Sequence, residues 1–107
     1  MLERIRELFT GEVRGAKRSA RWPALRRSVI EKVGECEACG GKEQLEAHHI
    51  NPVHLFPTLE LVEGNIIVLC EKHGCHFGFG HLLDYHSYNI HVRCDAASFY
   101  KKVKRRP

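Results

Sequence analysis

The chain has 107 residues, of which 28% are charged, and a formal net charge of +4 at pH 7. This length normally makes one domain, whose modest core often needs a disulfide or metal staple. Residues 1–9, MLERIRELF, carry charges throughout. We therefore expect neither a secretory signal nor a membrane span, and we expect a cytoplasmic protein. In that reducing compartment, the five cysteines favour metal binding over disulfides.

In chain order, residues 2–9 predict a first helix and residues 19–34 a second one. In the second helix Pro23 occupies the first turn and Gly34 ends it. Its predicted apolar stripe contains Trp22, Leu25, Val29, Ile30 and Val33. Residues 36–42, CEACGGK, predict a tight turn in which glycines let backbone amides face sulfur.

Two short strands are predicted next, at residues 45–50 and 66–69, with a loop over 51–64 between them. A hairpin of these strands would bring His49 near Asn65. Residues 76–88, HFGFGHLLDYHSY, predict a further helix, which Gly78 and Gly80 weaken. The expected fold class is α+β, in one domain with a helical basic segment at 1–34, a zinc-stapled core at 35–91 and a basic, disordered tail at 101–107.

Basic residues gather at both ends, whereas nine acidic residues outnumber the three basic ones between residues 34 and 100. Basic arms around a non-basic centre suit a polyanion that is held through its phosphates. The alternative is that these charges are solvated faces or disordered ends. The residues expected to contact the polyanion are Arg14, Lys17, Arg18, Arg21, Arg26, Arg27, Lys101 and Lys102.

The cysteine spacing predicts a closed metal site. Cys36 and Cys39 form one Cys-x2-Cys half-site, and Cys70 begins a second half-site with either Cys75 or His73. Four thiolate or imidazole ligands leave no open position on a tetrahedral Zn²⁺, so the predicted role is structural. Cys75 is preferred over His73 because sulfur is the softer partner for a site with three thiolates. The alternative is a set of buried free thiols.

The segments CEACG, LEAHHINP, EGNIIVLC and CHFGFGH, within residues 22–88, resemble the HNH endonuclease family, which has the ββα-metal fold. The resemblance implies a DNA endonuclease with one catalytic divalent cation and products with 5′-phosphate and 3′-hydroxyl ends. It implies that His48 and His76 bind the cation, His49 is the general base and Asn65 braces the hairpin. The family commonly has Cys-x2-Cys-His where this chain has CEKHGCH, two residues longer, so His73 stays open as a zinc ligand.

Mg²⁺ or Mn²⁺ is the expected catalytic ion, and an imidazole site would also accept Ni²⁺ or Zn²⁺. His81 follows His76 by five positions, which is about 140° on a regular helix, so it is expected as an accessory ligand or a phosphate contact. Adjacent residues of a strand point to opposite faces, so His48 and His49 can serve one phosphate only if the strand end twists. DNA is the expected partner, without a membrane and with a protein partner supplying specificity. The rival functions are a non-catalytic zinc-ribbon DNA-binding module and a phage-type adaptor protein.

Overall fold

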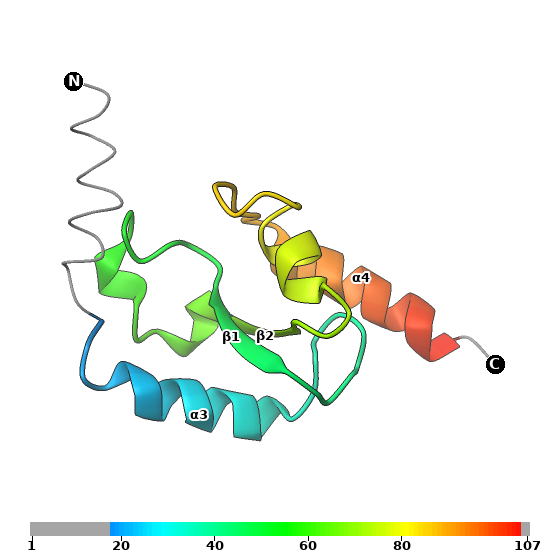
Figure 1. Ribbon diagram of the computed structural model, residues 1–107, viewed down its shortest axis with the longest axis horizontal. Coiled ribbons are helices and arrows are strands. Elements are labelled where there is room, and N and C mark those ends of the chain that lie inside the picture. The colour runs from blue at the N-terminus through cyan, green and yellow to red at the C-terminus, as the bar shows by residue number, and fades with distance from the viewer. Residues whose placement is uncertain (1–17, 106–107) are drawn as a thin grey trace.

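The computed structural model describes residues 18–105 (Figure 1). The predicted helix at 2–9 and the basic residues Arg14 and Lys17 lie outside this range. A two-stranded antiparallel sheet lies between helices, which confirms the predicted α+β class. The elements are α3 Trp22–Val33, β1 Leu45–His49, 3-10 turns Pro57–Leu59 and Glu63–Asn65, β2 Ile66–Cys70, a π-helical turn His76–Gly80, and α4 Val92–Arg105.

Helix α3 has the predicted ends. Pro23 lies in its first turn, where the missing N–H costs nothing. Gly34 ends the helix in the left-handed conformation, with φ 76°, and donates its N–H to Ile30 O at 2.8 Å. The predicted stripe packs on one face of the sheet, where Val29 meets Ile66 and Val68.

Strand β2 is buried along its whole length because both faces of the sheet are covered. Ile66 and Val68 face α3, while Ile67 and Leu69 face a second core that includes the cysteines and α4. A strand covered on both faces has a continuous apolar sequence, as IIVL does. Cα pairs run from Leu45 opposite Cys70 to His49 opposite Ile66.

The helix predicted over residues 76–88 is wrong. Only the π turn His76–Gly80 forms, and turns without a helix follow. Leu82 and Leu83 adopt φ values of 55° and 67°, in the left-handed region that no right-handed helix uses.

The prediction of a disordered tail is also wrong for residues 101–105, which form the last turns of α4. Val92 and Ala96 are buried on one face of this helix, and Phe99 stacks on Phe79 of the π turn with ring centroids 5.2 Å apart. Asn89 joins the same two elements, since its Nδ2 donates to Phe79 O at 3.0 Å and to Asp95 in α4 at 2.8 Å. Among residues 18–105, neither α-helix combines the length and apolar character that a bilayer crossing would need.

Candidate functional site

Four cysteines form a compact cluster at one end of the sheet. The Sγ atoms of Cys36, Cys39, Cys70 and Cys75 all lie within 4.8 Å of one another, and every cysteine is a free thiol. The first two come from the turn after α3, and the other two from the end of β2 and the loop after it. This is the ligand set predicted from the spacing, and it can bind a metal such as zinc.

Backbone amides face the sulfur atoms, as the glycines of the turn predicted. The N–H groups of Ala38 and Cys39 point to Cys36 Sγ at 3.4 Å, and the N–H of Gly41 points to Cys39 Sγ at 3.4 Å. These donors stabilise thiolates, the form that binds metal. A Cβ at Gly41 would lie 3.3 Å from Cys39 Sγ, which explains the glycine.

His73 lies at the rim of the cluster. Its Nδ1 is 3.5 Å from Cys39 Sγ and 3.9 Å from Cys70 Sγ, and the residue is exposed, whereas Cys75 is buried. Burial and the neighbouring Cys36 raise the pKa of the Cys75 thiol. Buried thiols this close together can all ionise only when a cation balances their negative charge. The structure therefore favours Cys75 as the fourth ligand.

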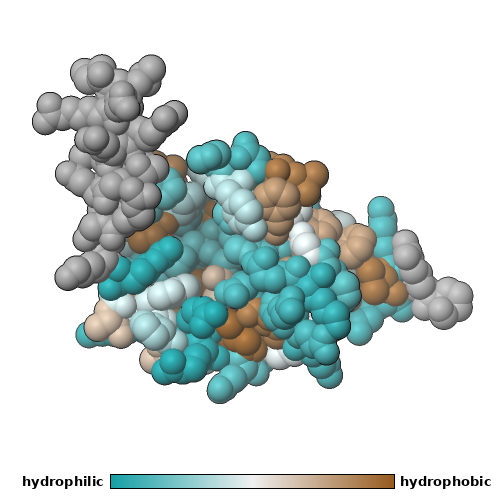
Figure 2. Space-filling view, in the orientation of Figure 1, coloured by the Kyte–Doolittle hydropathy of each residue, from teal (hydrophilic) through white to brown (hydrophobic). Residues whose placement is uncertain are grey.

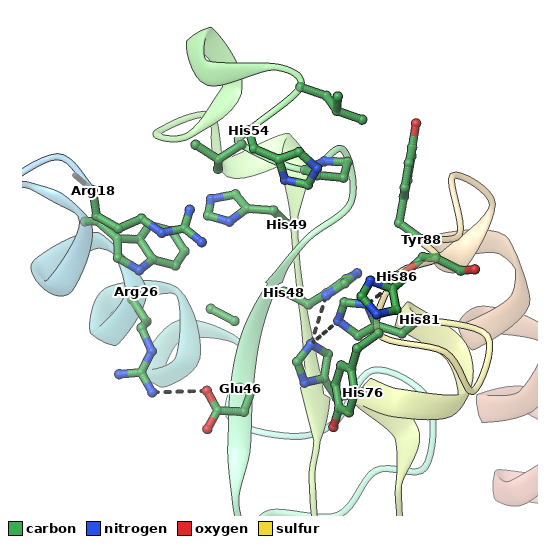
Figure 3. A pocket seen from close by; sticks show the side chains of 17 residues that line it. Arg18, Arg26, Glu46, His48, His49, His54, His76, His81, His86 and Tyr88 are labelled. Atoms are coloured by element: carbon green, nitrogen blue, oxygen red, sulfur yellow. Dashed lines mark hydrogen bonds and ion pairs between the residues drawn. The ribbon is translucent and has the colours of Figure 1, made fainter. Parts of the chain in front are cut away.

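Three histidines form a second cluster, at the other end of the hairpin. Nδ1 of His48 lies 2.9 Å from Nε2 of His76, and Nε2 of His81 lies 3.2 Å from the same atom. Each pair of rings has centroids 4.8 Å apart. Figure 3 shows His48 coming from β1 and the other two from the segment after Cys75, with all three rings turned toward one point.

Hydrogen bonds on the far side of two rings determine which nitrogen faces that point. Nδ1 of His76 lies 2.5 Å from Glu71 Oε1, and Nδ1 of His81 lies 3.0 Å from Ser87 O. Both partners are acceptors, so each Nδ1 carries the proton and each Nε2 presents a lone pair to the centre.

His48 is the buried member of the cluster, with 5% of its surface exposed. Burial, followed by the charges of His76, His81 and His49, lowers its pKa from 6.5 to about 3. Among residues 18–105, its Nε2 has no hydrogen-bond partner and packs against Gly80. A neutral imidazole whose other nitrogen faces two more imidazoles could be one of three ligands of a divalent transition metal.

The π turn brings His81 into this cluster. On a regular helix it would lie about 140° away from His76. Here the N–H of His81 bonds to His76 O at 3.2 Å, an i→i+5 closure that places both rings on the same side. The accessory ligand suggested by sequence is thus a full member of the cluster, and the regular-helix geometry assumed for it is wrong.

His49 leaves the strand on the opposite face, toward α3. Its ring stacks on Trp22 with centroids 4.3 Å apart, and its Nε2 lies 2.9 Å from Glu60 O. Because a carbonyl only accepts, Nε2 carries the proton and Nδ1 keeps its lone pair. Burial lowers the pKa of His49, although the hydrogen bond to Glu60 opposes it. His49 is therefore a neutral base near pH 7.

Asn65 ties together the two ends of the loop between the strands. Its Oδ1 accepts the N–H of Asn51 at 2.8 Å, and its Nδ2 donates to Asn51 O at 3.1 Å and to Leu59 O at 3.3 Å. The N–H of Ile50, next to His49, bonds to Asn65 O at 2.8 Å. These bonds fix the end of β1, where the histidine doublet lies.

Both histidines of the doublet line one open cleft of about 650 Å³, although their rings point to different walls (Figure 3). The surface is hollowed above the hairpin, and hydrophilic residues form most of the visible wall (Figure 2). Arg18 and Arg26 line the cleft, and Arg26 is paired with Glu46 at 3.2 Å. The other predicted basic contacts within the described range do not line it: Arg21, Arg27, Lys101 and Lys102.

Sequence reasoning missed several neighbours of the site. Trp22 was assigned only to the apolar stripe, yet it also stacks on His49. His54 and His86 also line the cleft, although no sequence pattern assigned them a role, and Glu71, which contacts His76, had none either. These residues come together only in the folded chain, so no local sequence pattern predicts their contacts.

No family model matches the chain. The comparisons with curated proteins and with solved structures also find no match.

Proposed function

We propose that this protein is a metal-dependent DNA endonuclease of the HNH type, with a ββα-metal fold in which the π turn His76–Gly80 takes the place of the helix after the second strand. One observation carries the proposal. Three imidazole nitrogens converge in a cleft that is also lined by a neutral histidine with a free lone pair. This combination supplies a cation site and a base for the hydrolysis of a phosphodiester.

The cation would be held by Nδ1 of His48 and by the Nε2 atoms of His76 and His81. When bound there, Mg²⁺ or Mn²⁺ supplies positive charge to the phosphate oxygens and to the leaving oxygen. Three protein ligands leave positions for water and phosphate, in contrast to the four-cysteine cluster, for which we propose structural Zn²⁺.

His49 is the proposed general base. Its Nδ1 accepts a proton from a water molecule while the water oxygen bonds to phosphorus and the bond from phosphorus to the 3′-oxygen breaks. The proton then returns to the 3′-oxygen through solvent, which leaves a 3′-hydroxyl and a 5′-phosphate. Trp22 and Glu60 O hold the ring from two sides, so the lone pair keeps one direction during this step.

Arg18 supports DNA as the substrate class. It is exposed at the cleft, and its guanidinium lies over the Trp22 ring at 5.7 Å, beside His49. A guanidinium there can neutralise a phosphate next to the one that is cleaved. Contacts of this kind position the backbone and do not read bases, so we expect weak sequence preference.

A plasmid assay tests the proposal. Supercoiled plasmid is incubated with the purified protein and Mg²⁺, Mn²⁺ or EDTA, next to the variants His49→Ala and His91→Ala. His91 is exposed and does not line the cleft, so it is the matched control. We expect metal-dependent nicking that His49→Ala reduces by at least about 100-fold and His91→Ala leaves unchanged, as for loss of a general base.

Other outcomes would identify the rival functions. DNA binding without nicking under any metal would contradict the enzyme and support a non-catalytic zinc-ribbon module. Neither binding nor nicking would support an adaptor protein. Equal nicking by wild type and His49→Ala would remove His49 from the mechanism.

A further inference from the structure

Glu71 lies in the segment of the chain that connects the thiol cluster to the histidine cluster. It follows Cys70 in the chain, and its carboxylate reaches forward to His76, which follows Cys75. At each end of the seven-residue segment from Cys70 to His76, a thiol-cluster cysteine therefore precedes one partner of this pair. Cys70 precedes Glu71, Cys75 precedes His76, and the carboxylate and the ring lie 2.5 Å apart.

We propose that Glu71 is a positioning residue that holds His76 for the catalytic cation, and that a metal in the cysteine cluster fixes both ends of the segment that carries this pair. This inference rests on the proposed function, because it requires a cation among the three histidines. It adds a physical link between the two metal sites.

The contact with Glu71 determines the tautomer of His76. A carboxylate accepts the Nδ1–H of His76 and leaves the Nε2 lone pair directed at His48 and His81. A carboxylate behind a ligating histidine also raises the basicity of the nitrogen that binds the metal. Of the three histidines, only His76 has such a partner in the described structure, since His81 bonds to a carbonyl.

The ion pairs and backbone bonds around Glu71 leave its carboxylate directed at His76. The side chain of Lys72, its neighbour in sequence, pairs with Glu43 instead. The backbone of Glu71 is also fixed, because its N–H bonds to Gln44 O at 2.8 Å and its carbonyl accepts the N–H of Gly74 at 3.0 Å. The side chains of His76 and Glu71 are 18% and 39% exposed, so the ring is shielded while the carboxylate stays in contact with water.

Peptide bonds connect both partners of the pair to the thiol cluster, since Glu71 follows Cys70 and His76 follows Cys75. Cys70 and Cys75 are buried in the thiol cluster, and a metal bound there would hold their Sγ atoms at fixed separations. Glu71 and His76 are each one residue away from these anchors, so the distance between carboxylate and ring follows the geometry of the thiol cluster. Occupancy of one site therefore organises the ligands of the other.

Metal titration of the full chain tests this inference. Protein with one equivalent of Zn²⁺ is titrated with Co²⁺, and binding is followed by calorimetry and visible absorption, for wild type, Glu71→Gln and Glu43→Gln. Glutamine keeps the shape of the side chain and removes the charged acceptor. Glu43→Gln is the matched control, because it removes a nearby carboxylate that pairs with Lys72.

We expect Glu71→Gln to weaken Co²⁺ binding about 10- to 100-fold and to change its absorption spectrum, as for the loss of a carboxylate behind a histidine ligand. Zinc content and melting temperature should stay at the wild-type values, which a purely structural role of Glu71 would not allow. Glu43→Gln should match wild type. If Glu71→Gln loses zinc, Glu71→Asp, which keeps the carboxylate, should bind zinc and show intermediate Co²⁺ affinity.

The failures can be told apart. A zinc-loaded wild type that binds no Co²⁺ contradicts the proposed function, and this inference with it. Wild type and Glu71→Gln that bind Co²⁺ with equal affinity overturn the inference alone. A Glu71→Asp variant no better than Glu71→Gln also overturns it, because the carboxylate is then not what matters.

Discussion

Nδ1 of His48 lies 2.9 Å from Nε2 of His76, although the two residues are 28 positions apart and come from a strand and from a π turn. This contact exists because β1 and the π turn pack against each other, with Gly80 directly against the His48 ring. A displacement of a few tenths of an ångström on either side therefore changes the distance between two proposed ligands.

Gly80 offers a test of this packing without touching a ligand. A Cβ at this position would lie 3.0 Å from His48 Nε2, so Gly80→Ala must displace the His48 ring by a few tenths of an ångström and change the distance between His48 and His76. We expect Co²⁺ affinity to fall by about tenfold, in the range that changes around a metal ligand produce. Gly78→Ala is the control, because a Cβ there would meet nothing within 4 Å. Equal affinities of the two variants would show that the ring adapts.

The pH dependence of cleavage should report His49. Burial lowers its pKa below the usual 6.5, and the base must be neutral to accept a proton. The neutral fraction rises with pH, so single-turnover cleavage should increase with pH and pass half of its plateau value below pH 6.5. The measurement is the rate from pH 5 to 8 with saturating Mn²⁺. A rate that first levels off above pH 7.5 would assign the base to another group.

The fourth ligand of the proposed zinc site can be decided by metal content. Cys36→Ser and Cys75→Ser should lose stoichiometric zinc and unfold, because zinc binding contributes on the order of 10 kcal/mol to domains of this kind. His73→Ala should keep one zinc per chain, since His73 lies at the exposed rim of the cluster. Elemental analysis and thermal melting measure both effects. Zinc loss in His73→Ala with retention in Cys75→Ser would exchange the two assignments.

The salt dependence of DNA binding should separate the basic residues. Arg18 lines the cleft, whereas Lys102 is exposed on α4 and does not. We expect Arg18→Ala to weaken binding and to reduce the slope of log K against log salt by about 1, the value for one lost phosphate contact. Lys102→Ala should leave the slope unchanged. The reverse result would place the DNA along α4 and away from the cleft.

Sequence predicted the parts of the fold that depend on local signals. Pro23 and Gly34 mark the ends of α3 through their backbone chemistry, and the cysteine spacing identified the thiol cluster. The histidine doublet was identified by its resemblance to a family motif, and the structure places His48 beside His76 and His49 beside Trp22. The alternation of side chains along a strand explains why His48 faces the π turn and His49 faces α3.

The remaining features depend on tertiary packing. Helix α4 was missed because the charges of its last turns resemble a disordered tail, whereas the buried stripe with Val92 and Ala96 forms only against the π turn and the thiol cluster. The position of His81 was wrong because a regular helix was assumed. Glu71 escaped notice because an acidic residue in a loop has no distinctive pattern until its partner is known.

The i→i+5 closure between His76 and His81 makes the length of this segment critical. Loss of a single codon within residues 77–80 would leave four steps between the histidines, enough for an ordinary helical turn but with every downstream residue shifted by one place. Leu82 would then occupy the position that now bonds to His76 O. A substitution at Gly78 can be absorbed, because a Cβ there meets nothing within 4 Å, but we expect insertions and deletions to be excluded.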